Sequence, residues 1–404
     1  MFAIVTYTLV IPVTWEKLPK DVKKFLILFS INGFSFSALI AAPTLGNLMN
    51  ISLESVGWLF SLSSFLQALL SYFVGRKFEK LPPTYGLAIS RAIFGIGSLL
   101  YGLCTNVWTF AAAQLFLSFT DIFYPCLVMY ERALFPPKQR EIIYSLEFFM
   151  TESTKAIAYA LFVFVFAPLM QGQSFLRSIF FMIFFANVFY SAAYLFILPK
   201  VESGSTVHSE HVIASTGLKI FFSIMLHQYL CYTAFNFSSF LIISYYLIDL
   251  FKMPAWSPFL FEMVFSATVA TSIFWKGKVK SHPSFNLIFG ASAIAANFLI
   301  WIIQNPILFF TSHVLMGIGF IFWFPAKETI KQQVAPRQLG RWEGFFQGLN
   351  ILTRIFTPIA SATVASRLGY GFVFAISAIL FFSAIVVSMP SVLWMKKNFG
   401  IERV

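Results

Sequence analysis

The chain has 404 residues, of which 58% are hydrophobic and only 11% are charged. Soluble domains carry about 25% charged residues, so this composition excludes a cytosolic enzyme, a nucleic-acid-binding protein and a disordered chain. The net charge of +12 does not indicate a nucleic acid partner, because the basic residues lie in short segments between long apolar runs. The composition indicates instead a protein surrounded by the lipid bilayer.

The apolar runs are long enough to cross a membrane, because a spanning helix needs about 20 mostly apolar residues. Twelve such runs follow one another in two sets of six. The predicted spans lie at roughly 25–46, 55–74, 84–103, 107–130, 142–168, 175–198, 218–247, 256–275, 285–303, 306–326, 343–366 and 370–395. We therefore expect an all-α membrane protein with twelve transmembrane helices in two pseudo-symmetric six-helix bundles.

Segment 201–216 is the longest polar stretch between spans, and it divides the chain nearly in half. Such a segment is typical of a linker between two bundles. The expected domains are a cytoplasmic N-terminal segment (1–23), an N-terminal bundle (24–200), a cytoplasmic linker (201–216), a C-terminal bundle (217–397) and a cytoplasmic tail (398–404).

The basic residues predict the orientation, because Lys and Arg accumulate in the cytoplasmic loops of membrane proteins. With the N-terminus inside, 22 of the 28 Lys and Arg residues fall on the cytoplasmic side, and Lys327 and Lys331 are assigned there after the tenth span. We expect both termini in the cytoplasm and the protein in the plasma membrane. Arg91, near the inner end of the third span, is expected to extend its side chain to the membrane interface.

The two halves resemble each other at an offset of 200 residues. An aromatic residue precedes proline near the end of the fourth and of the tenth span, and basic residues after the second span recur after the eighth. The matching pairs are Tyr124-Pro125 with Phe324-Pro325, Pro136 with Pro336, Arg76 with Lys276, and Lys80 with Lys280. Duplicated six-helix halves are typical of transporters, in which the substrate site lies between the repeats.

On these residues the chain resembles the major facilitator superfamily of transporters, over about 24–397. The family's loop motif after the second span, Gly-x-Leu-x-Asp-Arg-x-Gly-Arg-Arg, corresponds to segment 71–80. Arg76 and Lys80 match this motif, and Gly75 stands in place of its acidic residue. The resemblance implies a twelve-helix transporter that works as a monomer, and a part for Arg76 and Lys80 in conformational gating.

A second gating feature is a row of glycines that leads into the eleventh span. Gly340 and Gly344 are four residues apart, and Gly348 continues the row. Small residues at this spacing let helix backbones approach closely, as a closing cytoplasmic gate requires. Ordinary tight packing is the alternative.

Ionisable side chains inside the predicted spans are few, and each costs roughly 2.5–3.5 kcal/mol to insert. The resemblance implies that spans one, two, four, five, seven, eight, ten and eleven line a central cavity. All the deeply placed ionisable residues lie on those spans: Asp121, Glu147, Glu152, Lys155, His227, Glu262, His313 and Arg354. Because such groups usually face a cavity and have partners, this distribution is the strongest indication of function in the sequence.

Four of these residues are expected to take part in proton coupling or charge pairing: Asp121, Glu152, Lys155 and Glu262. Glu152 and Lys155 are three residues apart, and therefore neighbours on one helix face. Asp121, from the adjacent fourth span, is expected to join them. A permanent ion pair that only holds the bundle together is the alternative.

Polar groups on the same spans are expected to contact the substrate: Asn32, Gln114, His227, His313, Asn350 and Arg354. Arg354 offers a planar set of donors suited to a carboxylate or phosphate, with pairing to Glu262 or Glu152 as the alternative. Glu262 and His313 are similar in type to the carboxylate–histidine pair of proton-coupled sugar symporters in this superfamily. For the amides, interhelical hydrogen bonds are the alternative.

The sequence therefore predicts a secondary active transporter of a small polar organic solute, working by alternating access, with proton-coupled symport as the main hypothesis. A drug or metabolite exporter, an uncoupled facilitator and a transporter-like sensor are the alternatives. We expect no enzyme activity, cofactor or metal, because no nucleotide-binding loop, zinc-protease motif or nucleophile elbow occurs. The expected partners are the solute, protons and the lipid bilayer, and no nucleic acid.

Overall fold

The computed structural model describes residues 15–78, 82–136, 139–201, 217–272, 282–333 and 339–398. Each of the twelve predicted spans contains a helix within these ranges. Nine helical segments in the described residues are long and apolar enough to cross a membrane, and two shorter apolar helices cover the fourth and eighth spans. The predicted all-α membrane fold is therefore confirmed. Apart from residue 201, the predicted linker lies outside the described residues.

The N-terminal bundle holds spans one to six. Its elements in chain order are α2 (Lys20–Ile31), η1 (Asn32–Phe36), α3 (Ser37–Leu48), α4 (Leu53–Phe78), α5 (Pro83–Leu103), α6 (Val107–Ser118), η2 (Phe119–Phe123), α7 (Tyr124–Leu134), α8 (Arg140–Leu161), η4 (Phe162–Phe166) and α9 (Gly172–Phe196).

The C-terminal bundle holds spans seven to twelve. Its elements in chain order are α10 (Gly217–Phe237), α11 (Phe240–Tyr245), η5 (Tyr246–Leu250), α12 (Ser257–Thr271), α13 (Pro283–Trp301), α14 (Pro306–Gln333), α15 (Leu339–Leu368) and α16 (Tyr370–Asn398).

Several spans are not continuous α-helices. The first and fourth are interrupted by the 3-10 turns η1 and η2, the seventh is broken between α10 and α11, and η4 and η5 are π-helical. Such irregular turns often mark functional positions. Asn32 and Asp121, two of the predicted site residues, lie in η1 and η2. A pattern of apolar residues does not reveal a five-residue change from 3.6 to 3.0 residues per turn.

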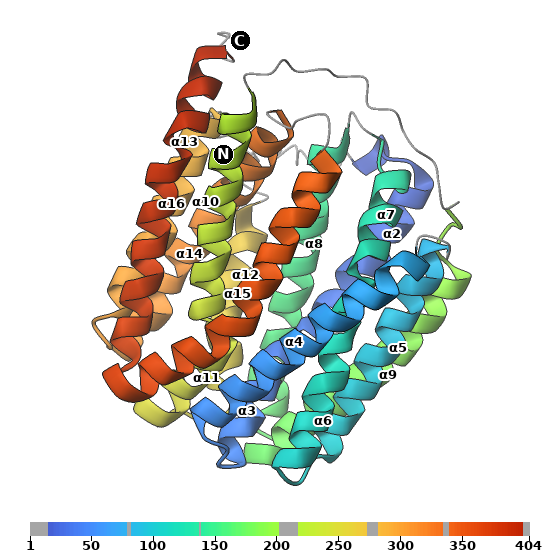
Figure 1. Ribbon diagram of the computed structural model, residues 1–404. Helices are drawn as coiled ribbons and strands as arrows, with labels where there is room; N and C mark the ends of the chain where they lie inside the picture. The colour runs from blue at the N-terminus through green and yellow to red at the C-terminus, as the bar shows by residue number, and fades with distance from the viewer. Residues whose placement is uncertain are drawn as a thin grey trace, which may run out of the picture.

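The two bundles lie side by side and meet along two seams (Figure 1). One seam is formed by α4 and α15, and the other by α8 and α12. Within each bundle the third and sixth, or ninth and twelfth, spans pack on one another as α5 with α9 and α13 with α16. The seams bring the ionisable residues of the two halves together.

At the end of the molecule where α3 and α11 lie (Figure 1), hydrogen bonds tie the two bundles together. The Thr44 hydroxyl donates to the Ser244 hydroxyl at 3.1 Å, and Asn47 Nδ2 donates to Asp249 Oδ1 at 2.7 Å. The Tyr245 hydroxyl donates to the backbone oxygen of Ile51 at 2.6 Å. These three bonds hold the first span and the loop after it against the seventh span at this end, and we call them the end contacts.

Gly57 allows α4 to approach α15 closely near the same end. A Cβ atom on this residue would lie 2.9 Å from both the Ala362 side chain and the Pro358 backbone oxygen. Real Cβ atoms essentially never make contacts this short, so only glycine permits this approach of the two helices. The seam is therefore closed by backbone proximity as well as by hydrogen bonds.

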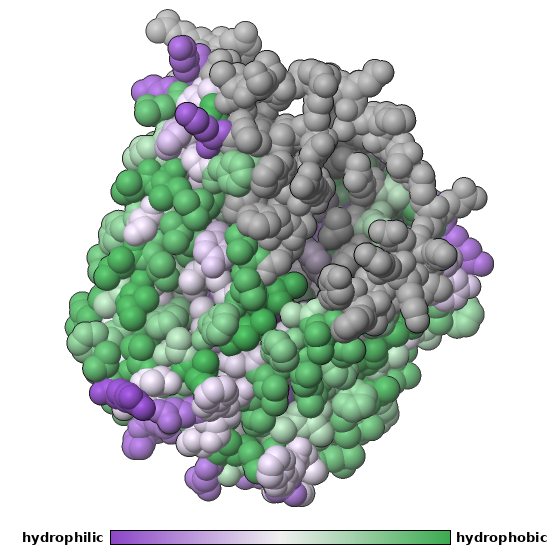
Figure 2. Space-filling model, viewed as in Figure 1, coloured by the Kyte–Doolittle hydropathy of each residue, from purple (hydrophilic) through white to green (hydrophobic). Residues whose placement is uncertain are grey.

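The outer surface matches a membrane-embedded protein. Figure 2 shows that hydrophobic residues cover most of the coloured surface on the face in view, with hydrophilic residues gathered towards its two ends. Large apolar side chains are well exposed in the described residues, among them Phe185, Phe189 and Phe356. A soluble protein rarely exposes apolar patches of this extent, whereas lipid chains cover them in a bilayer.

Candidate functional site

An ion pair lies at mid-depth on α8. Lys155 Nζ and Glu152 Oε1 are 2.6 Å apart, as their spacing of three residues predicts. The Glu152 residue is only 3% exposed, and Lys155 Nζ also lies 4.5 Å from the centre of the Phe36 ring in η1. The lysine is therefore held both by a carboxylate and by an aromatic face, which attracts cations.

Glu152 also connects the two bundles. Its second oxygen, Oε2, accepts a hydrogen bond of 2.7 Å from the Ser266 hydroxyl on α12. Ser266 was not predicted as a site residue, because a single serine in a span carries no signal of its own. It does follow Glu262 by four residues, which places both on one face of α12.

Asp121 pairs across the bundles with a different residue from the one predicted. Arg354 Nη2 on α15 donates to Asp121 Oδ2 at 2.7 Å, so Asp121 does not join the Glu152–Lys155 pair, and Arg354 pairs with neither Glu262 nor Glu152. Helix spacing relates residues of one span only, whereas this partner depends on where α15 lies against the other bundle. The Asp121 and Arg354 side chains are 45% and 40% exposed, so both are accessible.

Glu262 and His313 lie together in the C-terminal bundle. His313 Nε2 is 3.4 Å from Glu262 Oε1, within ion-pair distance but without hydrogen-bond geometry, and neither ring nitrogen of His313 has a hydrogen-bond partner. The His313 ring is 1% exposed and stacks on Phe261 with 3.8 Å between ring centres.

Asn350 lies one helical turn before Arg354 on α15. The Thr353 hydroxyl donates to the Asn350 backbone oxygen at 2.7 Å and lies 3.4 Å from Asn350 Oδ1. Asn236 Nδ2 on α10 also donates to the Thr353 hydroxyl, at 3.3 Å. Asn350 is half-buried.

Asn32 and Gln114, two other predicted substrate contacts, instead bond inside the N-terminal bundle. Arg91 donates to Asn32 Oδ1, so the arginine turns inward rather than extending to the interface as predicted. Gln114 Oε1 accepts from the Tyr101 hydroxyl at 2.5 Å, and its Nε2 donates to the Ser63 hydroxyl at 3.3 Å. Both side-chain amides therefore form hydrogen bonds between helices, which was the alternative to a contact with the substrate.

His227 is likewise occupied by its own bundle. Its Nε2 accepts a hydrogen bond of 2.8 Å from the Trp323 indole, and its Nδ1 lies 2.8 Å from the Ala384 backbone oxygen, to which it donates. With 0% exposure, the ring has no polar atom left for a substrate. The geometry therefore does not support the predicted substrate contact at His227.

Lys327 was assigned to a cytoplasmic segment, and this assignment is wrong. It lies in α14 with 0% exposure, 2.8 Å from Glu328 and 2.9 Å from the Tyr232 hydroxyl, to which it donates. The rings of Tyr232, Trp323 and Phe324 surround its ammonium group. A lysine near a span end looks the same in sequence whether it enters water or such an aromatic cage.

Most of the predicted gating residues have no described side-chain surroundings. Arg76 lies in α4, and Gly340 and Gly344 lie in α15, but their surroundings are not part of the described structure; Lys80 lies outside the described residues altogether. Among the described residues no group of three or more His, Cys, Asp or Glu side chains could hold a metal ion.

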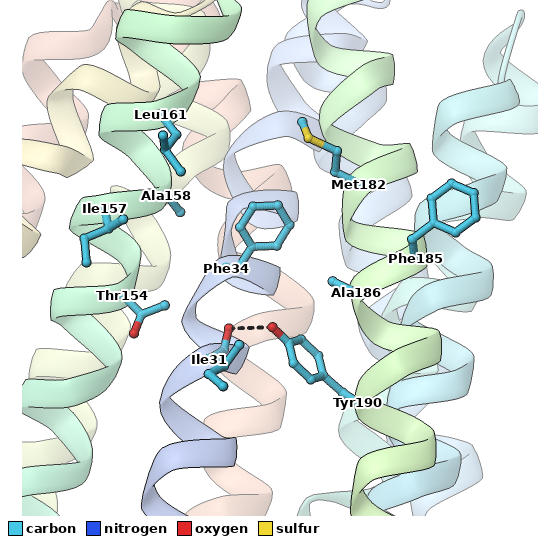
Figure 3. Close-up of a pocket in the computed structure, with 10 residues that line it drawn as sticks. All are labelled: Ile31, Phe34, Thr154, Ile157, Ala158, Leu161, Met182, Phe185, Ala186 and Tyr190. Carbon is cyan, nitrogen blue, oxygen red and sulfur yellow. Dashed lines mark hydrogen bonds between the residues drawn. The ribbon is translucent and has the colours of Figure 1, made fainter.

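A groove of about 480 Å³ lies between α8 and α9 of the N-terminal bundle, and none of the ionisable residues described above lines it (Figure 3). Apolar residues of α8 and α9 form its walls, and Ile31 and Phe34 of the first span form its floor. Its position between two helices of one bundle distinguishes it from the seams, so it is not the predicted substrate site.

Comparison with known proteins identifies the family. The model of the Major Facilitator Superfamily matches residues 25–326, so the chain belongs to this family of membrane transporters. No curated protein sequence matches the chain. The resemblance predicted from the sequence is therefore confirmed.

Solved structures share the fold at low identity. The chain is similar to the nucleoside transporter NupG (13% identity, TM-score 0.65, covering 92% of this chain and 100% of that one). It is also similar to a D-xylose-proton symporter (14% identity, TM-score 0.65, covering 92% of this chain and 97% of that one). A third similar structure is the inward-open xylose transporter XylE from E. coli (14% identity, TM-score 0.66, covering 94% of this chain and 96% of that one). At these identities the likeness establishes the fold alone.

Proposed function

We propose that the chain is a secondary active transporter that moves a small polar organic solute across the plasma membrane by alternating access, in symport with protons. The observation that carries this proposal is the pair of polar connections between the bundles at mid-depth, Asp121–Arg354 and Glu152–Ser266. Alternating access requires the halves to move against each other. Both connections therefore have to break and re-form during a transport cycle.

The solute would bind where these connections break. Arg354 and Asp121 are accessible and offer one cation and one anion, while Asn350 adds an amide one turn away. A polar solute that replaces the partner of either charge would favour a different arrangement of the bundles. We propose Asp121, Asn350 and Arg354 as the solute contacts.

The proton would bind at Glu262 and His313. Asp121 and Glu152 each lie within ion-pair distance of a basic side chain, Arg354 and Lys155 respectively. Glu262 has no such cation within ion-pair distance among the described residues; its only partner at that distance is His313, which is neutral or charged according to protonation. Adding one proton to this pair therefore removes an uncompensated buried charge.

The end contacts support an inward-open state. With cytoplasmic termini, they lie on the extracellular side, and the bundles are joined there by hydrogen bonds. We propose that one chain holds the complete transport pathway and therefore works as a monomer. An exporter or an uncoupled facilitator would use the same fold, and a sensor would keep the fold without net flux.

The experiment is reconstitution in liposomes that contain a pH-sensitive dye, with counterflow of radiolabelled D-xylose, uridine, amino acids and organic acids measured in parallel. We expect one solute class to show counterflow and to drive proton entry. Glu262→Gln should keep counterflow and lose proton entry, whereas the control Glu54→Gln, in the first turn of α4, should keep both. Counterflow without proton entry in the unaltered protein would establish a facilitator, and no counterflow with any class would contradict the proposal.

A further inference from the structure

The groove between α8 and α9 has no free polar group. The Tyr190 hydroxyl donates to the Ile31 backbone oxygen at 3.1 Å (Figure 3), and the Thr154 hydroxyl donates to the Met150 backbone oxygen at 3.0 Å. The other lining side chains are apolar. A buried water needs two to four polar partners, so neither water nor a polar solute is stabilised there.

The groove lies within segments that are long and apolar enough to cross a membrane. Its walls and floor belong to three membrane-spanning segments, Lys20–Leu48, Leu146–Phe166 and Gly172–Phe196. Along α8 it runs from Thr154 to Leu161, about 10 Å at the rise of an α-helix. One leaflet of the core is about 15 Å deep, so the groove takes part of one lipid chain and excludes a headgroup.

We propose that this groove is a binding site for one hydrocarbon chain of a membrane lipid, which enters from the bilayer between α8 and α9 and packs on Phe34. On a convex helix surface a lipid chain is contacted from one side. In the groove it is contacted by both walls and by the floor, and an empty groove would leave these side chains without van der Waals partners. Small residues on the two walls, Ala158 and Ala186, make the space for it.

The bound chain would support the helix that carries the Glu152–Lys155 pair. Thr154, in the groove wall, is the neighbour of Lys155, and Phe34, in the floor, follows Gly33, which packs directly on the backbone of α8 at Thr151 and Lys155. The lipid chain therefore lies behind the ion pair, on the outer side of the contact between the first and fifth spans. This inference does not depend on which solute is transported.

The test uses the full chain in nanodiscs of dioleoyl phosphatidylcholine with a small share of phosphatidylcholine that carries a diazirine in mid-chain. After illumination, peptide mass spectrometry locates the adducts. We expect saturable adducts on the groove residues of α8 and α9, at a higher level than around Ala192, which is exposed on α9 but does not line the groove. Ala186→Phe should remove the groove adducts, and the matched control Ala192→Phe should keep them.

Three results would overturn the inference. They are labelling of the groove no stronger than that of the Ala192 face, groove adducts that persist in folded Ala186→Phe, and cross-links to a second copy in place of lipid. If Ala186→Phe does not fold, Ala158→Leu fills the groove from the other wall and gives the same comparison. Because no solute is present, a failed transport assay leaves this result unaffected.

Discussion

At His227, two groups of the same bundle occupy both nitrogens of a buried imidazole. The Trp323 indole donates to one nitrogen, and the other donates to the Ala384 carbonyl, which requires the neutral ring. The residue thus connects α10 with α14 and α16. A polar side chain in a membrane span can therefore serve packing alone, although its sequence position also fits a substrate contact.

We expect His227→Leu to lower the free energy of unfolding by about 1–3 kcal/mol, because the Trp323 indole is left buried without a partner. The measurement is thermal unfolding of the purified protein in detergent. Adding Trp323→Phe removes the second partner, so the double variant should be less destabilised than the sum of the two single changes. Equal stability of His227→Leu and the unaltered protein would show that the hydrogen bond contributes nothing.

Neutral substitutions of Glu152 and Asp121, the two acidic residues that connect the bundles, should lower the stability of the protein by different amounts. Glu152→Gln leaves Lys155 without its counter-charge in a buried site and should cost about 3–5 kcal/mol. Asp121→Asn disrupts a pair that is nearly half exposed and should cost at most about 1 kcal/mol. Both should impair transport, so the stability measurement separates structural from functional loss. The reverse order of stabilities would contradict the burial seen at these two sites.

The sequence predicted contacts within a helix better than contacts between helices. Glu152 and Lys155 could be paired from their spacing alone, because three residues bring side chains onto one face. The partner of Asp121 could not, since Arg354 is 233 positions away and meets it only through the arrangement of the bundles. Lys327 was misplaced for a related reason: its aromatic cage is assembled from two helices, α10 and α14.

Among the elements, the first span shows how a local irregularity positions a side chain. The 3-10 turn η1 separates α2 from α3 and carries Phe36, whose ring lies against Lys155. Gly33 in the same turn packs so closely on α8 that a Cβ atom would lie 2.6 Å from the Thr151 backbone oxygen. The turn and the fifth span are therefore fitted to one another at the level of the backbone.

We expect Gly33→Ala to destabilise the protein by about 1–3 kcal/mol and to reduce transport, because the added methyl group pushes η1 away from α8. Thermal unfolding and solute counterflow measure the two effects. Gly371→Ala is the matched control, since its nearest neighbour is the flexible end of the Gln304 side chain at 3.1 Å. A Gly33→Ala protein that matches this control in both assays would refute the close packing.

In the whole molecule, the long apolar runs were sufficient to predict twelve spans and two bundles. They did not predict at which end the bundles meet, because the end contacts involve short polar side chains that look like ordinary turn residues in sequence. A transporter must occupy more than one arrangement, and only one is seen here. The state is set by a few contacts, whereas the fold is set by hundreds of apolar residues.

A disulfide introduced at the end contacts should prevent the two bundles from separating at that end. Thr44→Cys with Ser244→Cys should form a disulfide under mild oxidation, because the two hydroxyl oxygens are 3.1 Å apart and the native cysteines Cys104, Cys126 and Cys231 are buried. The oxidised protein should lose transport and regain it with a reductant, while either single variant should not respond. Full transport by the cross-linked form would show that this end does not need to open.

The bond between Thr44 and Ser244 also bears on ancestry. The two positions are 200 residues apart, the same offset that relates the two halves of the chain. In an assembly of two identical subunits, a residue touches its own copy only on the symmetry axis. A side chain in that position has to form its hydrogen bond with the identical side chain of the other subunit. A hydroxyl group can do so, because it is both a donor and an acceptor. A six-helix ancestor that paired with a second copy of itself would have needed only one such residue to join its two subunits there.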